Sequence, residues 1–147
     1  MDVQFSFVIP SHPKFLAVVR ATVAELAATY GLSEPECCNV TLAVDEALAN
    51  IIRHAYHSEP AQPIELTCTA SEGSFDFTIL DRGQPFDPVR LPAEPPDEHA
   101  LGGRGTHLIR MIMDEAIYDR VSAGNRLRLR KRIPTTGTDA TSQRSDV

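Results

Sequence analysis

Strand-like and helical patterns follow one another along this chain in an order that few folds can accommodate. The alternating, strand-like stretches are 3–10, 64–70, 74–81, 116–121 and 126–133, and the stretches with helical spacing are 11–32, 33–56 and 106–115. A mostly antiparallel sheet with helices on one face accommodates this order economically. The sequence therefore predicts an α+β fold, a two-layer α/β sandwich.

Residues at the ends of these stretches support the boundaries. Ser11 and Ser33 are suited to cap the first two helices, and Pro35 is tolerated in a first helical turn. Gly31 is suited to end the first helix. The Ser-Glu-Gly segment at 71–73 is a hairpin signal between two alternating stretches.

Length, charge and hydropathy restrict the class of protein. A chain of 147 residues fits one domain, which we expect over residues 1–133, with a polar, disordered tail over 134–147. The net charge of -6 argues against a nucleic-acid surface, because phosphate binding usually needs basic character. No apolar run approaches the ~18 residues that cross a bilayer, and the N-terminus lacks a signal-peptide pattern. We therefore expect a cytoplasmic protein with neither a nucleic-acid nor a membrane partner.

Two polar side chains, Glu46 and Asn50, stand one helical turn apart in the segment VTLAVDEALANIIRHAY, residues 40–56. The apolar residues of this segment form a wide stripe that should face the core, and Glu46 and Asn50 lie on the other side. A carboxylate and a carboxamide oxygen stacked in this way can present hard oxygen atoms to a magnesium–phosphate complex. An ordinary solvated helix face would show the same pattern.

A carboxylate also ends the strand FDFTILD. Asp81 is followed by Arg82 and Gly83. This carboxylate can accept a hydrogen bond from an exocyclic amine, while the glycine permits the close approach of a ligand. An ordinary Asp-x-Gly turn is the alternative interpretation.

A glycine-rich segment, LGGRGTHLIRMIM, opens the third helical stretch with Gly102, Gly103 and Gly105. Free backbone N–H groups and the positive end of a helix can meet a phosphate chain there, although a flexible hinge is the alternative. The segment is not a P-loop, because no G-x-x-x-x-G-K-[ST] motif occurs. The long aperiodic segment before it, from about Pro88 to Ala100, is typical of a functional lid.

Taken in order, the E-x-x-x-N helix, the D-x-G turn, the long loop and the G-x-G helix start resemble the GHKL (Bergerat) nucleotide-binding fold. This is the ATPase family of gyrase, MutL and sensor histidine kinases. Within it, the strings DEALANIIRHAY, DRGQPFDP and GGRGTHLIRMIMDE are most similar to the anti-sigma-factor serine/threonine kinases. The resemblance covers about residues 5–133 and implies ATP and Mg²⁺ as cofactors.

The resemblance implies a role for each matching residue. Glu46 would be the general base and Asn50 the magnesium ligand. Asp81 would accept a hydrogen bond from the adenine amine, beside Gly83. The nucleotide-binding positions before and within the third helix would be Gly103, Arg104, Gly105 and Thr106, with Gly103 and Gly105 forming the loop around the phosphates.

Two positions depart from the family pattern. Arg104 stands between the glycines, where family members often carry an apolar residue; it either helps to neutralise phosphate charge or faces solvent. Asn125 follows Gly124 where a Gly-Thr pair often lies near the adenine. The resemblance therefore does not carry over that contact.

The family's activity would be phosphorylation of a serine or threonine on a STAS-domain anti-sigma-factor antagonist. The resemblance further implies that the protein holds a sigma factor inactive by stoichiometric binding and acts as a homodimer. The alternative is a nucleotide-gated binding module that transfers nothing, because a base can be present and never meet a substrate hydroxyl.

Two further sets of residues each allow more than one interpretation. One set alternates on the last strand and predicts a solvated sheet face, with a surface for an acidic partner or a nucleic-acid patch as the alternatives, of which the acidic partner fits the kinase interpretation better: Arg126, Arg128, Arg130 and Arg132. The other has period two on predicted strands and indicates either core or a dimer contact: Phe5, Phe7, Phe75 and Phe77.

Overall fold

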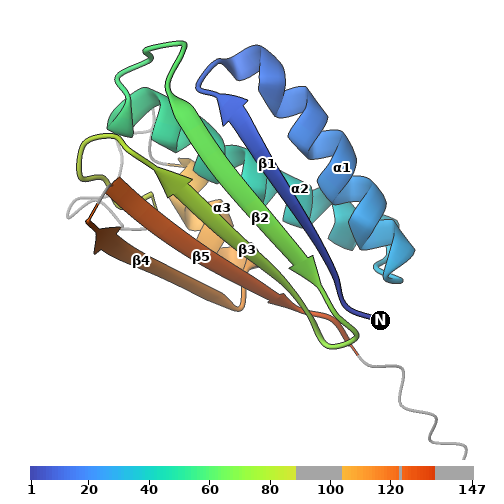
Figure 1. Ribbon diagram of the computed structural model, residues 1–147. Coiled ribbons are helices and arrows are strands. Elements are labelled where there is room, and N and C mark those ends of the chain that lie inside the picture. Colours follow the sequence, from blue (N-terminus) through green and yellow to red (C-terminus); the bar gives the residue numbers. More distant parts are fainter. Residues whose placement is uncertain (89–103, 123, 135–147) are drawn as a thin grey trace, which may run out of the picture.

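The computed structural model describes residues 1–88, 104–122 and 124–134, with the side chains of 104–106 excepted. The strands are β1 (Val3–Pro10), β2 (Pro63–Ala70), β3 (Ser74–Asp81), β4 (Glu115–Val121) and β5 (Gly124–Arg132), and the α-helices are α1 (Leu16–Thr29), α2 (Glu34–Asn50) and α3 (Arg104–Ile112). The sheet order is β1-β2-β3-β5-β4, and all neighbouring strands are antiparallel (Figure 1). The predicted α+β fold is confirmed.

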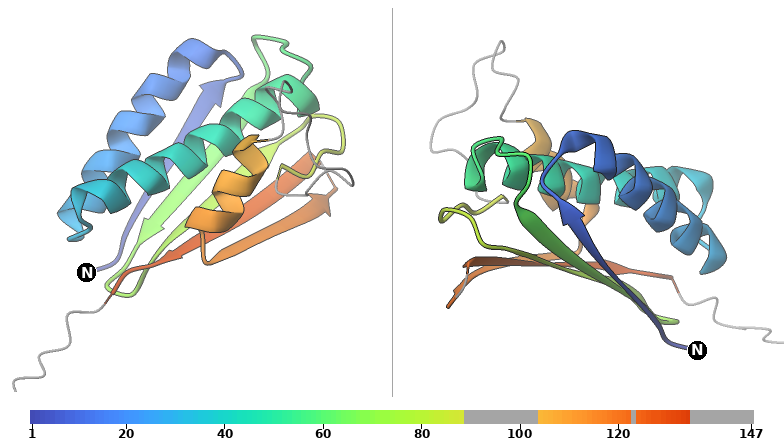
Figure 2. Two further views of the ribbon diagram at one scale, coloured as in Figure 1. Left: turned by 180° about the vertical axis from the view of Figure 1, so that it is seen from behind. Right: turned by 45° about the horizontal axis from the view of Figure 1, so that its top comes forward.

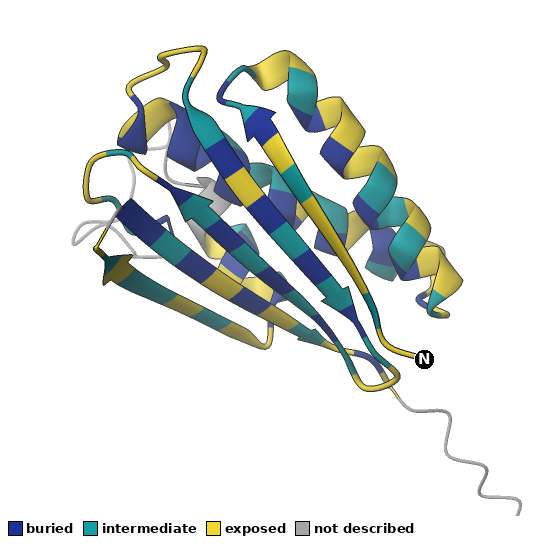
Figure 3. Ribbon diagram, viewed as in Figure 1, coloured by how far each residue is buried: buried dark blue, intermediate teal, exposed yellow. Residues whose placement is uncertain are grey.

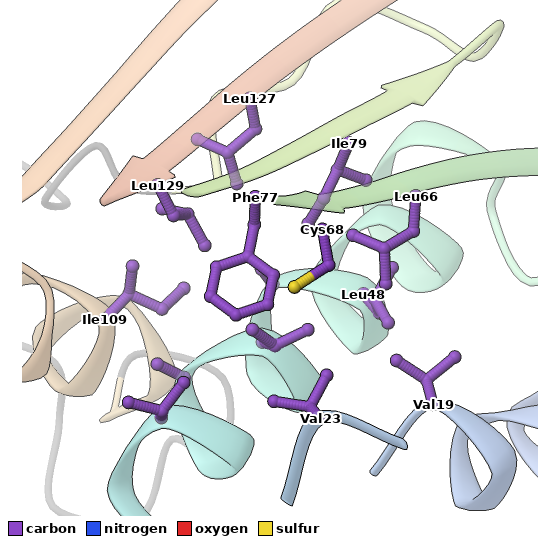
Figure 4. Packing of buried hydrophobic residues seen from close by; sticks show 14 of the residues in the cluster. Val19, Val23, Leu48, Leu66, Cys68, Phe77, Ile79, Ile109, Leu127 and Leu129 are labelled. Carbon is purple, nitrogen blue, oxygen red and sulfur yellow. The ribbon is translucent and has the colours of Figure 1, made fainter. Parts of the chain in front are cut away.

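The helices form one layer over one face of the sheet. Helix α2 packs against both α1 and α3, and α1 lies toward the β1 edge (Figure 2). Apolar side chains from both layers meet between them (Figure 4). Those fully buried at the centre include Val19, Val23, Leu48, Leu66, Cys68, Phe77, Ile79, Ile109, Leu127 and Leu129. This packing fixes α2 across the sheet.

Two predicted helix boundaries are confirmed, the end of α1 and the start of α2. Gly31 adopts φ 88° after the last turn of α1, and its N–H donates to the Ala28 carbonyl. Ser33 caps α2 in a capping box with Glu36, in which each side chain accepts from the backbone N–H of the other. The cap expected from Ser11 is wrong, because its hydroxyl bonds to the loop before β2 instead.

A π-helical turn, Ile51–Ala55, follows α2 directly, where the sequence predicts an uninterrupted helix. The N–H of Tyr56 donates to the Ile51 carbonyl five residues back, at 3.1 Å. Such wide turns are often found at functional sites. Here the turn begins immediately after Asn50.

The face of the sheet away from the helices is open to solvent (Figure 3). The arginines of β5 lie on it as predicted, and carboxylates of the neighbouring strands pair with them. Arg126 and Arg128 contact Asp119 at 2.9 and 3.1 Å, and Arg130 contacts Asp76 at 2.6 Å. Because this positive charge is largely compensated within the face, the solvated interpretation is favoured.

Candidate active site

Glu46 lies on α2 with its side chain half-buried. It forms no hydrogen bond or ion pair with another of the described residues, whereas its neighbour Asp45 pairs with Arg20 at 2.8 Å. A carboxylate without such a partner keeps its oxygen atoms available to accept a proton or a hydrogen bond.

Asn50 follows one helical turn later and is 2% exposed, so it is more deeply buried than its place opposite the apolar stripe predicts. Its Oδ1 accepts a hydrogen bond from Nη2 of Arg53 at 2.8 Å. The spacing of three residues on a helix was the available signal for this contact. A cation bound to Oδ1 would share that oxygen with the guanidinium or displace it.

Asp81 ends β3 and is 4% exposed. Its Oδ1 accepts hydrogen bonds from the N–H of Gly83 and from Nδ2 of Asn125, both at 2.8 Å. Its Oδ2 has no partner among the described residues. Burial raises the pKa of Asp81, while the bonds from Asn125 and Gly83 and the charge of Arg120 act in the opposite direction.

Position 83 must be a glycine because the backbone of Ala55 leaves no room for a side chain. A Cβ at this position would lie 2.5 Å from the carbonyl oxygen of Ala55. The N–H of Gln84 donates to that same oxygen at 2.9 Å. Close packing of the loop on the π-helical turn therefore requires a glycine here, and the expected close approach of a ligand stays a prediction.

Replacing Gly83 by alanine is expected to lower the free energy of unfolding by about 1–3 kcal/mol, because the added methyl group meets backbone atoms that cannot rotate away. Urea denaturation measures this loss. Gly73→Ala is the matched control, since a Cβ there would meet nothing within 4 Å. Equal stability of the two variants would show that the Gly83 loop tolerates displacement.

Two further contacts hold the loop after β3 against the end of the helical segment. The hydroxyl of Tyr56 accepts from the N–H of Arg82 at 2.7 Å and donates to the Pro63 carbonyl at 2.6 Å. The His54 ring lies against Phe86, with centroids 4.8 Å apart, and burial lowers the pKa of His54. The loop carrying Gly83 is therefore fixed to the segment that carries Asn50.

The glycine-rich segment is described only in part. Gly103, the predicted lid except Pro88, and the predicted tail over 134–147 except Pro134 lie outside the described residues. Helix α3 begins at Arg104, so Gly105 and Thr106 lie in its first turn rather than before it. The first backbone N–H groups of a helix have no intrahelical acceptor, as phosphate binding requires.

The described side chains fit a magnesium nucleotide in their chemistry. Asn50 supplies a neutral oxygen, Glu46 a carboxylate without a partner in the described part of the chain, and Asp81 an acceptor beside a fixed loop. Over residues 1–88, 104–122 and 124–134, no group of three or more His, Cys, Asp or Glu is arranged around a metal position. Within the same ranges, no helix combines the length and the apolar character needed to cross a bilayer.

Comparison with known proteins identifies the family. The family model for the histidine kinase-like ATPase domain matches residues 9–131 of the sequence. The chain belongs to this family. The predicted resemblance to the GHKL ATPases is thereby confirmed.

Among the relatives are serine-protein kinases named RsbW. The RsbW of Oceanobacillus iheyensis is 30% identical over 115 residues, which are 73% of this chain and 73% of the relative. The RsbW of Bacillus subtilis is 25% identical over 115 residues, which are 73% of this chain and 72% of the relative. These similarities confirm the predicted resemblance to the anti-sigma-factor kinases.

The fold is also found in a solved structure. The crystal structure of the RsbU and RsbW domains of a Mycobacterium tuberculosis protein superposes with a TM-score of 0.64 at 17% identity. The match covers 90% of this chain and 34% of that longer chain. At this identity the likeness shows the fold alone.

Proposed function

We propose that the protein is an ATP-dependent serine/threonine kinase that phosphorylates a STAS-domain antagonist and sequesters a sigma factor. The observation that carries the proposal is the carboxylate of Glu46, which has no partner among the described residues and lies one turn before Asn50 on a helix of a kinase-like ATPase. The naming of relatives as serine-protein kinases supports the choice of acceptor. We further propose a homodimer in the cytoplasm, as the family resemblance implies.

The chain's own residues would divide the work of phosphate transfer. The oxygen of the acceptor hydroxyl would bond to the γ-phosphorus while the bond from that phosphorus to the ADP leaving group breaks. Glu46 would receive the proton that the hydroxyl loses. Asn50 would hold Mg²⁺, which neutralises phosphate charge when bound. Asp81 would accept from the adenine amine. Backbone N–H groups from Gly103 through Thr106 would face the phosphates.

Calorimetry with magnesium and ATP, followed by transfer from γ-labelled ATP to the STAS-domain protein encoded nearby, tests the proposal. Binding with transfer supports the kinase. Binding without transfer supports the nucleotide-gated module instead. Absence of any adenine-nucleotide binding by well-folded, nucleotide-stripped protein would refute both.

Asp81→Asn is expected to weaken ATP binding by about 10- to 100-fold, because an amide N–H₂ in place of Oδ2 cannot accept from the adenine amine. Stability should not fall. The raised pKa of Asp81 means that this group favours folding when protonated, and that this contribution is lost as pH rises through the raised pKa. The melting temperature of Asp81→Asn at pH 7 should therefore equal or exceed that of the wild type. The difference between the two melting temperatures should be smaller at acidic pH. A joint loss of binding and stability would contradict this assignment.

A further inference from the structure

Asn125 is the second residue of β5 and the direct cross-strand partner of Asp81. It is 3% exposed, and both hydrogen atoms of its amide are used within the protein. Its Nδ2 donates to Oδ1 of Asp81 and to the carbonyl of Gln84, each at 2.8 Å. One side of the carboxamide therefore holds both the carboxylate and the loop that follows it.

The oxygen of the same carboxamide is held from the opposite direction. Its Oδ1 accepts from the Tyr118 hydroxyl, from Nη1 of Arg120 at 3.1 Å and from the N–H of Phe86 at 3.3 Å. Arg120 also donates to the carbonyl of Gly83 at 3.0 Å. Rotating the amide by half a turn would place its N–H₂ against three donors. The direction of Nδ2 toward Asp81 is therefore fixed.

This arrangement determines which oxygen of Asp81 remains free. Both of its donors, Gly83 and Asn125, bond to Oδ1, and Oδ2 has no partner among the described residues. An ionised Oδ2 can accept a hydrogen bond from an amino group but not from a carbonyl oxygen. Purines with an amine at position 6 would thus be favoured over those with an oxygen there.

We propose that Asn125 is the positioning residue of the base pocket, which holds Asp81 so that Oδ2 faces the exocyclic amine of adenine. The inference rests on the proposed function, since it presumes that Asp81 binds adenine. Asn125, which departs from the family pattern, thereby has a defined role in base selection.

The substitution Asn125→Asp keeps the acceptor oxygen of this side chain and changes only its donor group. The introduced carboxyl keeps an oxygen for Tyr118, Arg120 and Phe86. It has at most one proton where the amide had two, so it loses the bond to the Gln84 carbonyl at every pH when that proton points to Asp81. The donor toward Asp81 is present only while the carboxyl is protonated. Two carboxyl groups at this distance share a proton, which they lose as pH rises. The protonated form donates to Asp81 as the amide did, and the ionised form repels it.

We therefore expect the ATP affinity of Asn125→Asp, divided by that of the wild type, to be highest at about pH 5.5 and to fall about tenfold or more by about pH 8. Calorimetry over this range measures the ratio. The described charged or titratable groups around Asp81 are Arg82, Arg120, Tyr56 and Tyr118. These groups are present in both the variant and the wild type, so their titrations cancel in the affinity ratio.

Tyr118→Phe is the matched control. It removes a donor to Oδ1 of Asn125 and leaves Nδ2 in place, so its affinity ratio should stay flat with pH. A flat ratio for Asn125→Asp, or an equal fall for Tyr118→Phe, would overturn the inference.

Asn125→Ala provides a second measurement that needs no buried carboxyl pair. Its smaller side chain leaves room for water beside Tyr118 and Arg120. We expect it to lose most of the wild-type preference for ATP over inosine triphosphate, the 6-oxo analogue. An unchanged preference would overturn the inference while leaving the kinase proposal intact. A wild type that binds no ATP would remove both.

Discussion

Replacing Glu46 by glutamine is expected to lower the rate of phosphate transfer by about 10²- to 10⁴-fold, the range usual for loss of a general base. The amide has nearly the same shape as the carboxylate but cannot take up the proton of the acceptor hydroxyl. ATP affinity should change by less than about threefold, because the lost interaction belongs to the transition state. Single-turnover transfer from labelled ATP, with calorimetry beside it, measures the two quantities separately.

Asp45→Asn is the matched control for Glu46→Gln. It removes the adjacent carboxylate on the same helix, together with the exposed ion pair to Arg20. Transfer should remain near the wild-type rate, because this side chain contacts Arg20 at the surface. Wild-type transfer by Glu46→Gln would remove Glu46 from the mechanism and favour a base supplied by the partner or by water.

Replacing Phe77 by alanine is expected to lower the free energy of unfolding by about 3–5 kcal/mol. Phe77 is 1% exposed at the centre of the sheet and points between the layers toward the helices (Figure 4). The loss combines two contributions: the favourable free energy of moving the ring from water into the core, which alanine lacks, and the cost of the cavity that remains. It is a large part of the ~5–15 kcal/mol that stabilises a typical domain. Urea denaturation at constant protein concentration measures it.

Phe5 provides the comparison on the same face of the sheet. It pairs with Cys68, which pairs with Phe77, but β1 is an edge strand and Phe5 is 41% exposed. It lines an open groove of about 1240 Å³ between β1 and α1. Phe5→Ala should therefore cost less than about 1 kcal/mol. A larger cost that changes with protein concentration would instead identify a contact between subunits.

The sequence predicts most element boundaries because they depend on local patterns. The strands at 3–10 and 74–81 occur with the expected bounds, and Gly31 and Ser33 mark the junction of two helices. The adjacency of β3 and β5 is different. These strands are separated by a long segment, and their pairing depends on how the layers pack rather than on any local signal.

The candidate site shows the same division. Glu46, Asn50 and Asp81 could be singled out because each belongs to a short motif. Their partners could not be assigned: helical spacing permits the contact of Arg53 with Asn50 but rotamer choice decides it, and the contact of Asn125 with Asp81 depends on the register between β3 and β5. Register across non-consecutive strands is a property of the assembled sheet, so the network around Asp81 becomes visible only in the structure.

The pairing of Asp81 with Asn125 spans 44 residues, and it has a consequence for biosynthesis. A nascent polypeptide emerges from the ribosome N-terminus first, so β3 is available long before β5. Until β5 adds to the sheet, Asp81 has neither its amide partner nor its cross-strand neighbour. If Asp81 binds adenine as proposed, ribosome-bound chains that expose α2 and β3 but not β5 would have no formed base pocket, and ATP could not assist the folding of the early segments.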